Sequence, residues 1–193
     1  MISSLLGHSL DKPFAPLVRK ININPNIFTV FGFAVTAAAG AAISQNLRLG
    51  GALILAGGFL DMLDGIAART NGRVTDFGAF LDSVLDRYSD AFLFLGAAWY
   101  LREDLTGVVL STGTLVGAFL ISYSRARAEG LGKECKSGLM ERPERILLLA
   151  LGALTGWLLP VLWAMFFLTH ITVIQRLYHV WSLMSKGGGS GQA

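Results

Sequence analysis

The stretch "LDMLDGIAARTNGRVTDFGAFLDSVLDRYSDAF", residues 60–92, contains six aspartates, of which Asp61, Asp64, Asp82 and Asp86 are paired inside two otherwise apolar segments. Asp61 and Asp64 are three residues apart in the first segment, and Asp82 and Asp86 are four apart in the second. In an α-helix the two members of each pair lie on one face. A charged aspartate at the centre of a membrane helix costs about 2.5–3.5 kcal/mol on insertion scales. Four such residues therefore need cations to compensate them.

The 193-residue chain as a whole has the composition of an integral membrane protein. Hydrophobic residues make up 53% of it and charged residues 15%, whereas soluble domains carry about 25% charged residues. A helix needs about 20 apolar residues to cross the hydrocarbon layer. We therefore predict a single all-α membrane domain over residues 1–186, with six transmembrane helices at 27–45, 50–70, 76–101, 105–128, 143–159 and 161–183.

The segments between and beyond these spans also carry signals. Residues 1–24 lack a basic start followed by an apolar core, so they predict a short interfacial helix rather than a signal peptide. Turn residues at 70–72 predict that the second and third spans pack antiparallel against each other. Pro160 predicts a break between the last two spans, and the glycine-rich residues 187–193 predict a flexible tail outside the fold.

Basic residues are concentrated in the connecting segments that would lie on one and the same side of the membrane. Of the 16 lysines and arginines, 6 lie between residues 125 and 145, and others lie near the N-terminus and in the 69–73 turn. The opposite loops contain only Arg48 and Arg102. The positive-inside rule therefore predicts that both termini and the 125–145 connection are cytoplasmic.

The clustered carboxylates allow two interpretations. Oxygen ligands suit hard divalent cations such as Mg²⁺ or Mn²⁺, and four carboxylates can hold two of them. The same residues could instead conduct cations or protons in a membrane transporter. Gly65 and Gly78 leave space beside the acidic residues, although small residues also serve helix packing. Because Arg69 adds a cation suited to phosphate, we favour a metal–pyrophosphate site.

This acidic stretch resembles the signature of a known enzyme family. The run Asp61-x2-Asp64-Gly65-x2-Ala68-Arg69-x8-Gly78-x3-Asp82-x3-Asp86 is similar, at every fixed position, to the pattern of the CDP-alcohol phosphotransferase family. The resemblance implies a membrane enzyme that displaces CMP from a CDP-linked lipid, diacyl or archaeal, with an alcohol. It also implies two divalent cations, Mg²⁺ or Mn²⁺, and a homodimer; we expect no nucleic acid as a partner.

The resemblance further assigns roles to the residues of the motif. It implies that the four aspartates bind metal and that Asp86 also accepts the proton of the attacking hydroxyl. The donor nucleotide would contact Asp61, Gly65, Ala68, Arg69 and Gly78. Asn26 and Thr29, at the mouth of the first span, are further candidates for the nucleotide, although N-terminal capping explains them nearly as well.

Arginines in the second half of the chain predict a pocket for a phosphate on the acceptor alcohol. Arg142 and Arg145 begin a helix, where cations oppose the macrodipole, which suggests a bound anion. Arg176 lies within a span and has no obvious carboxylate partner nearby in the sequence. The candidate acceptor-phosphate residues are Arg125, Arg127, Arg142, Arg145 and Arg176.

These arginines also resemble the branch of the family that makes phosphatidylinositol phosphate, or its archaeal-lipid counterpart, from inositol 1-phosphate. A glycerol 3-phosphate acceptor, as in phosphatidylglycerophosphate synthesis, is the alternative, because it would need a similar cationic pocket. Asp90, one turn beyond Asp86, could lie near the second metal or the acceptor, or could pair with an arginine such as Arg87.

Overall fold

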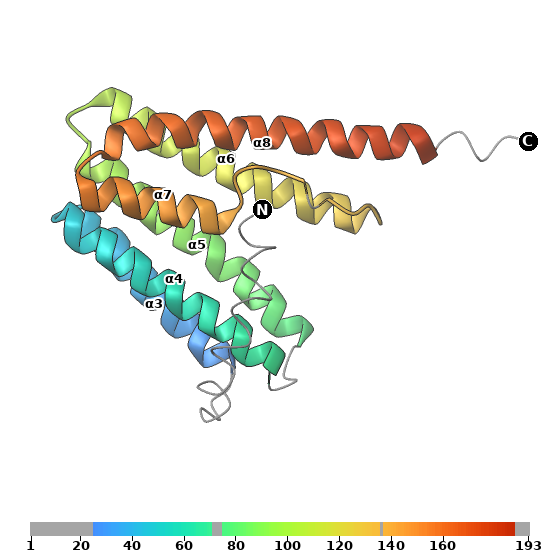
Figure 1. Ribbon diagram of the computed structural model, residues 1–193, viewed down its shortest axis with the longest axis horizontal. Coiled ribbons are helices and arrows are strands. Elements are labelled where there is room, and N and C mark those ends of the chain that lie inside the picture. The colour runs from blue at the N-terminus through green and yellow to red at the C-terminus, as the bar shows by residue number, and fades with distance from the viewer. Residues whose placement is uncertain (1–24, 71–74, 136, 188–193) are drawn as a thin grey trace, which may run out of the picture.

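The computed structural model describes residues 25–70, 75–135 and 137–187, in which all regular secondary structure is α-helical. The helices are α3 (Pro25–Ile43), α4 (Leu47–Thr70), α5 (Asp76–Tyr100), α6 (Leu105–Gly130), α7 (Arg142–Thr155) and α8 (Leu158–Gly187) (Figure 1). Each corresponds to one predicted span, so the all-α class is confirmed. The predicted interfacial segment, the turn at 71–72 and residues 188–193 lie outside the described residues.

Three of these helices are long and apolar enough to cross a membrane. The qualifying segments are Asn26–Ile43 in α3, Leu105–Gly130 in α6 and Leu158–Ser185 in α8. Helices α4 and α5 carry the acidic residues, and α7 has only 14 residues, or about 21 Å at 1.5 Å per residue. Length and composition therefore support an integral membrane protein with at least these three spans.

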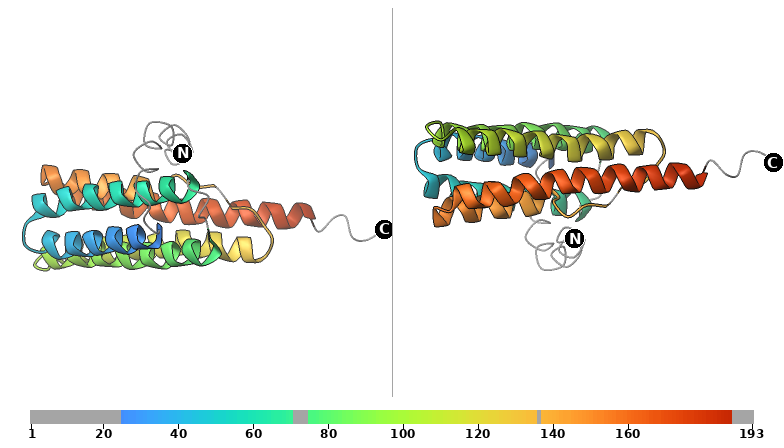
Figure 2. Two further views of the ribbon diagram at one scale, coloured as in Figure 1. Left: turned by 90° about the horizontal axis from the view of Figure 1, so that it is seen from below. Right: turned by 90° about the horizontal axis from the view of Figure 1, so that it is seen from above.

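The helices form two layers, with α3, α5 and α6 in one and α4, α7 and α8 in the other (Figure 2). Close packing joins α3 to α4 and α5, α6 to α5 and α8, and α7 to α4 and α8. The prediction that the second and third spans pack against each other was therefore wrong, because over the described residues α4 and α5 are not a closely packed pair and α3 packs against both. Asp61 and Asp86 consequently face each other across an interior space.

Glycines allow α3 and α5 to approach closely. A Cβ atom added at Gly96 would lie 2.1 Å from the carbonyl oxygen of Gly40, and one added at Gly40 would lie 2.4 Å from the carbonyl oxygen of Phe92. No side chain fits at either position, so the two backbones are in contact there. Small residues at crossing points are typical of helix packing in membranes, where dispersion contacts replace the hydrophobic effect.

The boundary between the last two helices lies earlier than predicted. Helix α7 ends at a C-cap, Gly156, whose φ of 80° places it in the left-handed region. Pro160 is the third residue of α8 rather than the separator. A proline in the first turn of a helix leaves no hydrogen bond unmade, because the first N–H groups have no partner within the helix.

Candidate active site

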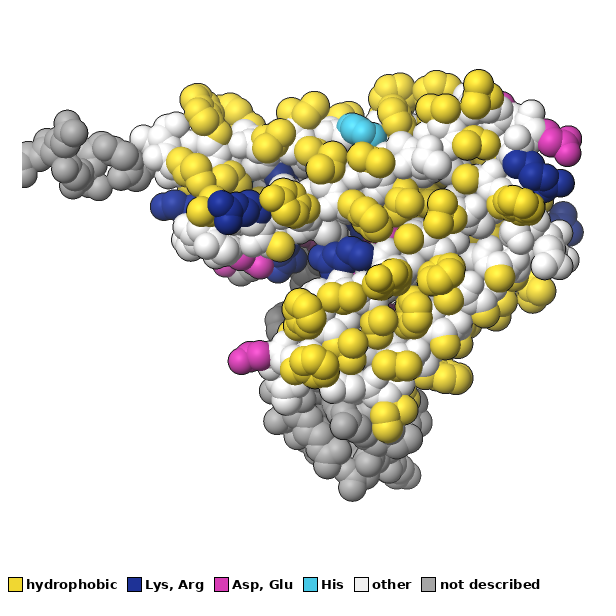
Figure 3. All heavy atoms as spheres, turned by 180° about the vertical axis from the view of Figure 1, so that it is seen from behind, with side chains coloured by type: hydrophobic (Ala, Val, Ile, Leu, Met, Phe, Trp, Pro, Cys, Tyr) yellow, Lys and Arg dark blue, Asp and Glu magenta, His cyan; other side chains and the backbone are white. Residues whose placement is uncertain are grey.

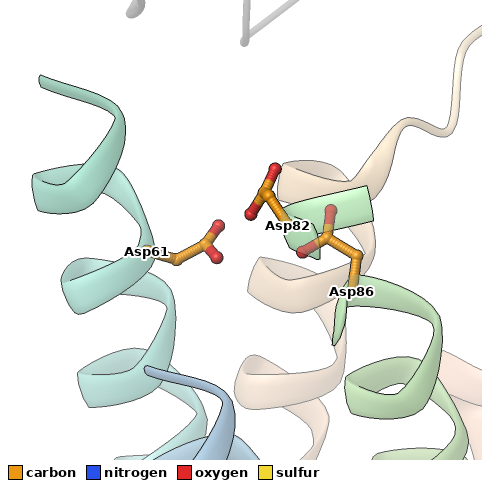
Figure 4. A group of neighbouring side chains, drawn as sticks. All are labelled: Asp61, Asp82 and Asp86. Carbon is orange, nitrogen blue, oxygen red and sulfur yellow. The ribbon is translucent and has the colours of Figure 1, made fainter. Parts of the chain in front are cut away.

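Three carboxylates converge at one end of the bundle. Asp61 extends from α4, and Asp82 and Asp86 extend toward it from successive turns of α5 (Figure 4). One oxygen of each lies within 4.8 Å of the others, and all three residues are half-buried. Three of the four predicted metal ligands therefore come together; the side chain of Asp64 lies outside the described part of α4. This separation of oxygens suits a divalent cation, whose ligands are carboxylate oxygens of this kind.

Arg142, the first residue of α7, joins the two sides of this cluster. Its Nη1 atom lies 2.5 Å from Asp61 Oδ2 and 2.8 Å from Asp86 Oδ1. The sequence predicted Arg142 as a ligand of the acceptor phosphate, and the structure places it against the carboxylates as well. Arg87 also lies 3.9 Å from Asp86, so two arginines stand beside the three carboxylates, and the formal charge of the group is still negative, which favours a further cation.

A cavity of about 400 Å³ opens beside the carboxylates, between α5, α6, α7 and α8. Asp82, Asp86 and Asp90 line it on the α5 side. Four of the predicted acceptor residues also line it: Arg125, Arg142, Arg145 and Arg176. The fifth, Arg127, is exposed on α6 and is absent from the lining. Asp82 and Asp86 thus belong both to the carboxylate cluster and to the wall of a cavity that holds five arginines and five carboxylates.

Arg176 is the most firmly held of these arginines. It is 2% exposed, and its Nε donates to the carbonyl oxygen of Ser137 at 2.9 Å. Its Nη1 donates to the carbonyl oxygen of Ile121, and its Nη2 lies 3.9 Å from Glu141. By contrast, Arg125 pairs with Glu129 one turn later on α6, at 2.8 Å, and is about half-exposed. The cavity therefore combines a buried arginine held by backbone carbonyls with a half-exposed arginine held by a carboxylate of its own helix.

The partner of Asp90 is Arg145, at 2.7 Å from Nη2 to Oδ2. Both side chains are 3% exposed. Arg87, the neighbour considered from the sequence, instead donates to the carbonyl oxygen of Ser83 and lies 3.9 Å from Asp86. Asp90 and Arg145 are 55 residues apart in the chain, so no local pattern could have paired them.

The first turns of α3 and α5 meet next to the carboxylates. A Cβ atom added at Gly78 would lie 3.0 Å from Asn26 Oδ1 and 2.9 Å from Thr75 Oγ1. Thr29, one turn along α3 from Asn26, is buried. The predicted nucleotide residues Asn26 and Gly78 are thus neighbours. The side chains of Ala68 and Arg69 lie outside the described residues.

Sequence analysis missed two residues of this region. Thr75 accepts a hydrogen bond from the Gly78 N–H at 3.0 Å and so caps α5; a threonine before an acidic first turn is its sequence signal. Glu141 lines the cavity next to Arg142, and its place directly before this predicted acceptor arginine is its only sequence signal. Hydrophobic side chains are spread over the face that Figure 3 shows, and several basic side chains lie beside its hollow.

Comparison with known proteins gives consistent matches over most of the chain. The sequence model of one family, described as CDP-alcohol phosphatidyltransferase, matches residues 22–182. The archaetidylinositol phosphate synthase of Methanothermobacter thermautotrophicus is 39% identical over 191 residues, which cover 91% of this chain and 96% of that protein.

Solved structures of the phosphatidylinositol phosphate synthase of Mycobacterium tuberculosis are similar in fold. The structure with CDP-DAG bound has a TM-score of 0.80 at 31% identity and covers 90% of this chain and 94% of that one. The complex with manganese and citrate has a TM-score of 0.79 at 31% identity and covers 89% and 88%.

Proposed function

Because this chain belongs to the CDP-alcohol phosphatidyltransferase family, we propose that it transfers the lipid phosphate of a CDP-lipid to a hydroxyl of inositol phosphate and releases CMP. One observation carries this proposal. Asp82 and Asp86, which form a carboxylate cluster with Asp61, also line a cavity that contains four of the five predicted acceptor arginines. A metal-binding cluster beside a phosphate-binding cavity is what a phosphorylated acceptor requires, and relatives named for inositol phosphate products support it.

The carboxylates fit a pair of divalent cations. Asp61, Asp82 and Asp86 offer oxygens that lie within 4.8 Å of one another, and we assign Asp64, three residues after Asp61, as a fourth ligand. Bound Mg²⁺ or Mn²⁺ would draw charge from the pyrophosphate and stabilise the leaving phosphate. The manganese complex of the mycobacterial relative supports this choice of metal. Around the pyrophosphate, Asn26, Thr29, Gly65, Ala68, Arg69 and Gly78 would accommodate the nucleotide.

Asp86 is suited to act as the general base. It belongs to the carboxylate cluster and also lines the cavity, so it lies between the two substrates. Its carboxylate would accept the proton of the attacking hydroxyl as that oxygen bonds to the lipid-bearing phosphorus. The bond from this phosphorus to the CMP oxygen breaks in the same displacement, and the departing charge stays on CMP.

The arginines of the cavity would bind the phosphate of the acceptor. Arg176 is held rigidly by two backbone carbonyls, Arg125 is exposed enough to reorient, and Arg142 reaches both Asp86 and the cavity. Guanidinium groups bind phosphate with two parallel hydrogen bonds, which adds orientation to charge. Arg127 lies outside the lining, and Arg145 is engaged with Asp90.

The substrates of this reaction also indicate how the protein lies in the membrane. We propose that all six helices span the bilayer as one domain and that the site end, with both termini, faces the cytoplasm. The buried pair of Asp90 and Arg145 supports this, because α5 and α7 turn these charged side chains inward. A polar nucleotide and a diacyl or ether-lipid tail then meet at the interface. Homodimerisation stays a prediction.

The deciding experiment is CMP release by the purified protein. CDP-diacylglycerol and its archaeal counterpart serve as donors with Mg²⁺ or Mn²⁺, and inositol 1-phosphate, glycerol 3-phosphate, serine and inositol as acceptors. We expect release with inositol 1-phosphate above all others. If CMP release is greatest with glycerol 3-phosphate, then glycerol 3-phosphate is the acceptor and the assignment of inositol phosphate is wrong. Cation flux through vesicles with no CMP release would refute the transferase.

A further inference from the structure

Two arginine–aspartate contacts connect α5 with α7 at successive levels of the bundle. Arg142 meets Asp86 at 2.8 Å, and Arg145 meets Asp90 at 2.7 Å. Residues four apart on α5 and three apart on α7 lie on the same face of their helices. The two contacts therefore lie one above the other, an outer pair (Arg142 with Asp86) and an inner pair (Arg145 with Asp90).

These side chains, rather than backbone packing, bridge the two helices. Among the described residues α5 and α7 are not a closely packed pair; α5 packs on α3 and α6, and α7 packs on α4 and α8. In Figure 2 they occupy the middle of opposite layers. A change in the inner pair therefore alters the spacing of α7 from α5, and this spacing sets where Arg142 lies.

The inner and outer pairs differ in exposure. The side chains of Arg142 and Asp86 are 20% and 18% exposed, so a ligand in the cavity can reach them. Both side chains of the inner pair are 3% exposed. Arg145 also donates to the carbonyl oxygen of Met140 at 3.3 Å, in the segment leading into α7. The inner pair thus borders the cavity but is almost inaccessible to solvent, and it is tied to the start of α7.

We propose that Asp90 and Arg145 are positioning residues for the transfer reaction. Their contact holds the first turn of α7 against α5, so that Arg142 reaches both Asp86 and the acceptor phosphate; Arg145 itself does not bind that phosphate. This inference rests on the proposed function. Its physical basis is that a buried charge whose partner is removed is strongly unfavourable, so neither residue tolerates loss of the other.

The alternative is that Arg145 binds the acceptor phosphate directly, as the sequence suggested. The two roles predict different behaviour of Asp90. If Arg145 positions α7, loss of either partner has the same consequence and the two effects are coupled. If Arg145 binds the acceptor phosphate, loss of Arg145 weakens acceptor binding. Loss of Asp90 then frees the Arg145 guanidinium and leaves acceptor binding unchanged or stronger.

The test is a double-mutant cycle with Asp90→Asn, Arg145→Gln and the pair together, assayed by CMP release. We expect each single variant to raise the KM of inositol 1-phosphate about 10- to 100-fold, with the KM of CDP-diacylglycerol changed less than about twofold. The double variant has a neutral Asn–Gln pair and no unpaired charge. Its fold-increase in acceptor KM is therefore smaller than the product of the two single-variant increases. A merely structural role would lower the active fraction and leave both KM values unchanged.

Two further variants guard against misfolding and general effects. Arg145→Lys keeps the charge and the fold while losing the planar donor group, and we expect an intermediate acceptor KM. Glu103→Gln removes one member of an exposed pair with Arg102 at 3.8 Å and serves as the control, with no change expected. Mn²⁺ affinity, measured by electron paramagnetic resonance, should stay within about twofold of wild type in this control.

Independent effects of the two substitutions, or an unchanged acceptor KM in Asp90→Asn, would overturn the positioning role. Equal rises in donor and acceptor KM would overturn it as well. A failure of the proposed function is distinguishable, because it is seen in the wild-type protein as no CMP release with any phosphorylated polyol. If the wild type prefers glycerol 3-phosphate, the same cycle is measured with that acceptor.

Discussion

Replacing Arg142 by alanine should change acceptor use and metal binding in opposite directions. The guanidinium lies 2.5 Å from Asp61 and 2.8 Å from Asp86, and Arg142 also lines the arginine-containing cavity. Its removal takes a phosphate-binding cation from the cavity and at the same time a competing cation from the carboxylate cluster. Acceptor binding therefore weakens while the cluster becomes more negative and binds divalent cations more tightly.

The sizes of the two effects follow from the geometry. A hydrogen bond to a charged group contributes about 1.5–3 kcal/mol, so loss of the phosphate contact should cost about 2 kcal/mol, or about 30-fold in kcat/KM for the acceptor. The side chain is 20% exposed, and solvent screening reduces the effect on the cluster. A unit charge about 4 Å away in a water-like medium contributes about 1 kcal/mol, or about fivefold in metal affinity.

Two measurements separate the effects. CMP release at varied inositol 1-phosphate and saturating CDP-diacylglycerol gives the acceptor kcat/KM, and Mn²⁺ titration followed by electron paramagnetic resonance gives the metal affinity. Arg142→Lys keeps the charge and should lie between wild type and alanine in both. Arg102→Ala, on an exposed loop, is the control. Weaker Mn²⁺ binding in Arg142→Ala, or an equal loss of donor and acceptor use, would refute the reasoning.

Three other predictions test the site and the fold. Asp86→Asn should lower kcat for CMP release by about 10²–10⁴-fold without loss of folded protein, because an amide cannot accept the proton; activity near wild type would remove Asp86 as the base. Removal of divalent cations with EDTA should abolish CMP release, and Mg²⁺ or Mn²⁺ should restore it, whereas a metal-independent rate would contradict the role of the carboxylates. Gly96→Leu should lower the melting temperature of the protein in detergent, because the new Cβ would lie 2.1 Å from the Gly40 carbonyl oxygen. Overpacking of this kind costs about 1–3 kcal/mol of stability. An unchanged melting temperature would mean that α3 and α5 are not in close contact.

Local signals in the sequence determined the helices and the acidic motif. Each predicted span corresponds to a helix of the structure, because hydrophobic runs and helical periodicity are properties of neighbouring residues. The spacing of Asp82 and Asp86 alone placed them on one face of a helix. Even the error at Pro160 was local, because a proline is equally compatible with a helix break and with a first turn.

Contacts between distant residues depended on the tertiary structure. Asp61 and Arg142 are 81 residues apart, and Asp90 and Arg145 are 55 apart; no periodicity relates such positions. The described helices pack in a closed ring in which α4 is separated from α5 and α7 lies opposite α5. The turn residues at 70–72 had instead predicted that the second and third spans pack against each other. The same packing brings Arg125, Arg142 and Arg176 to one cavity and leaves Arg127 outside it. The chemistry could be read from residue types, whereas its geometry follows from which helices pack together, since packing is a property of the whole chain.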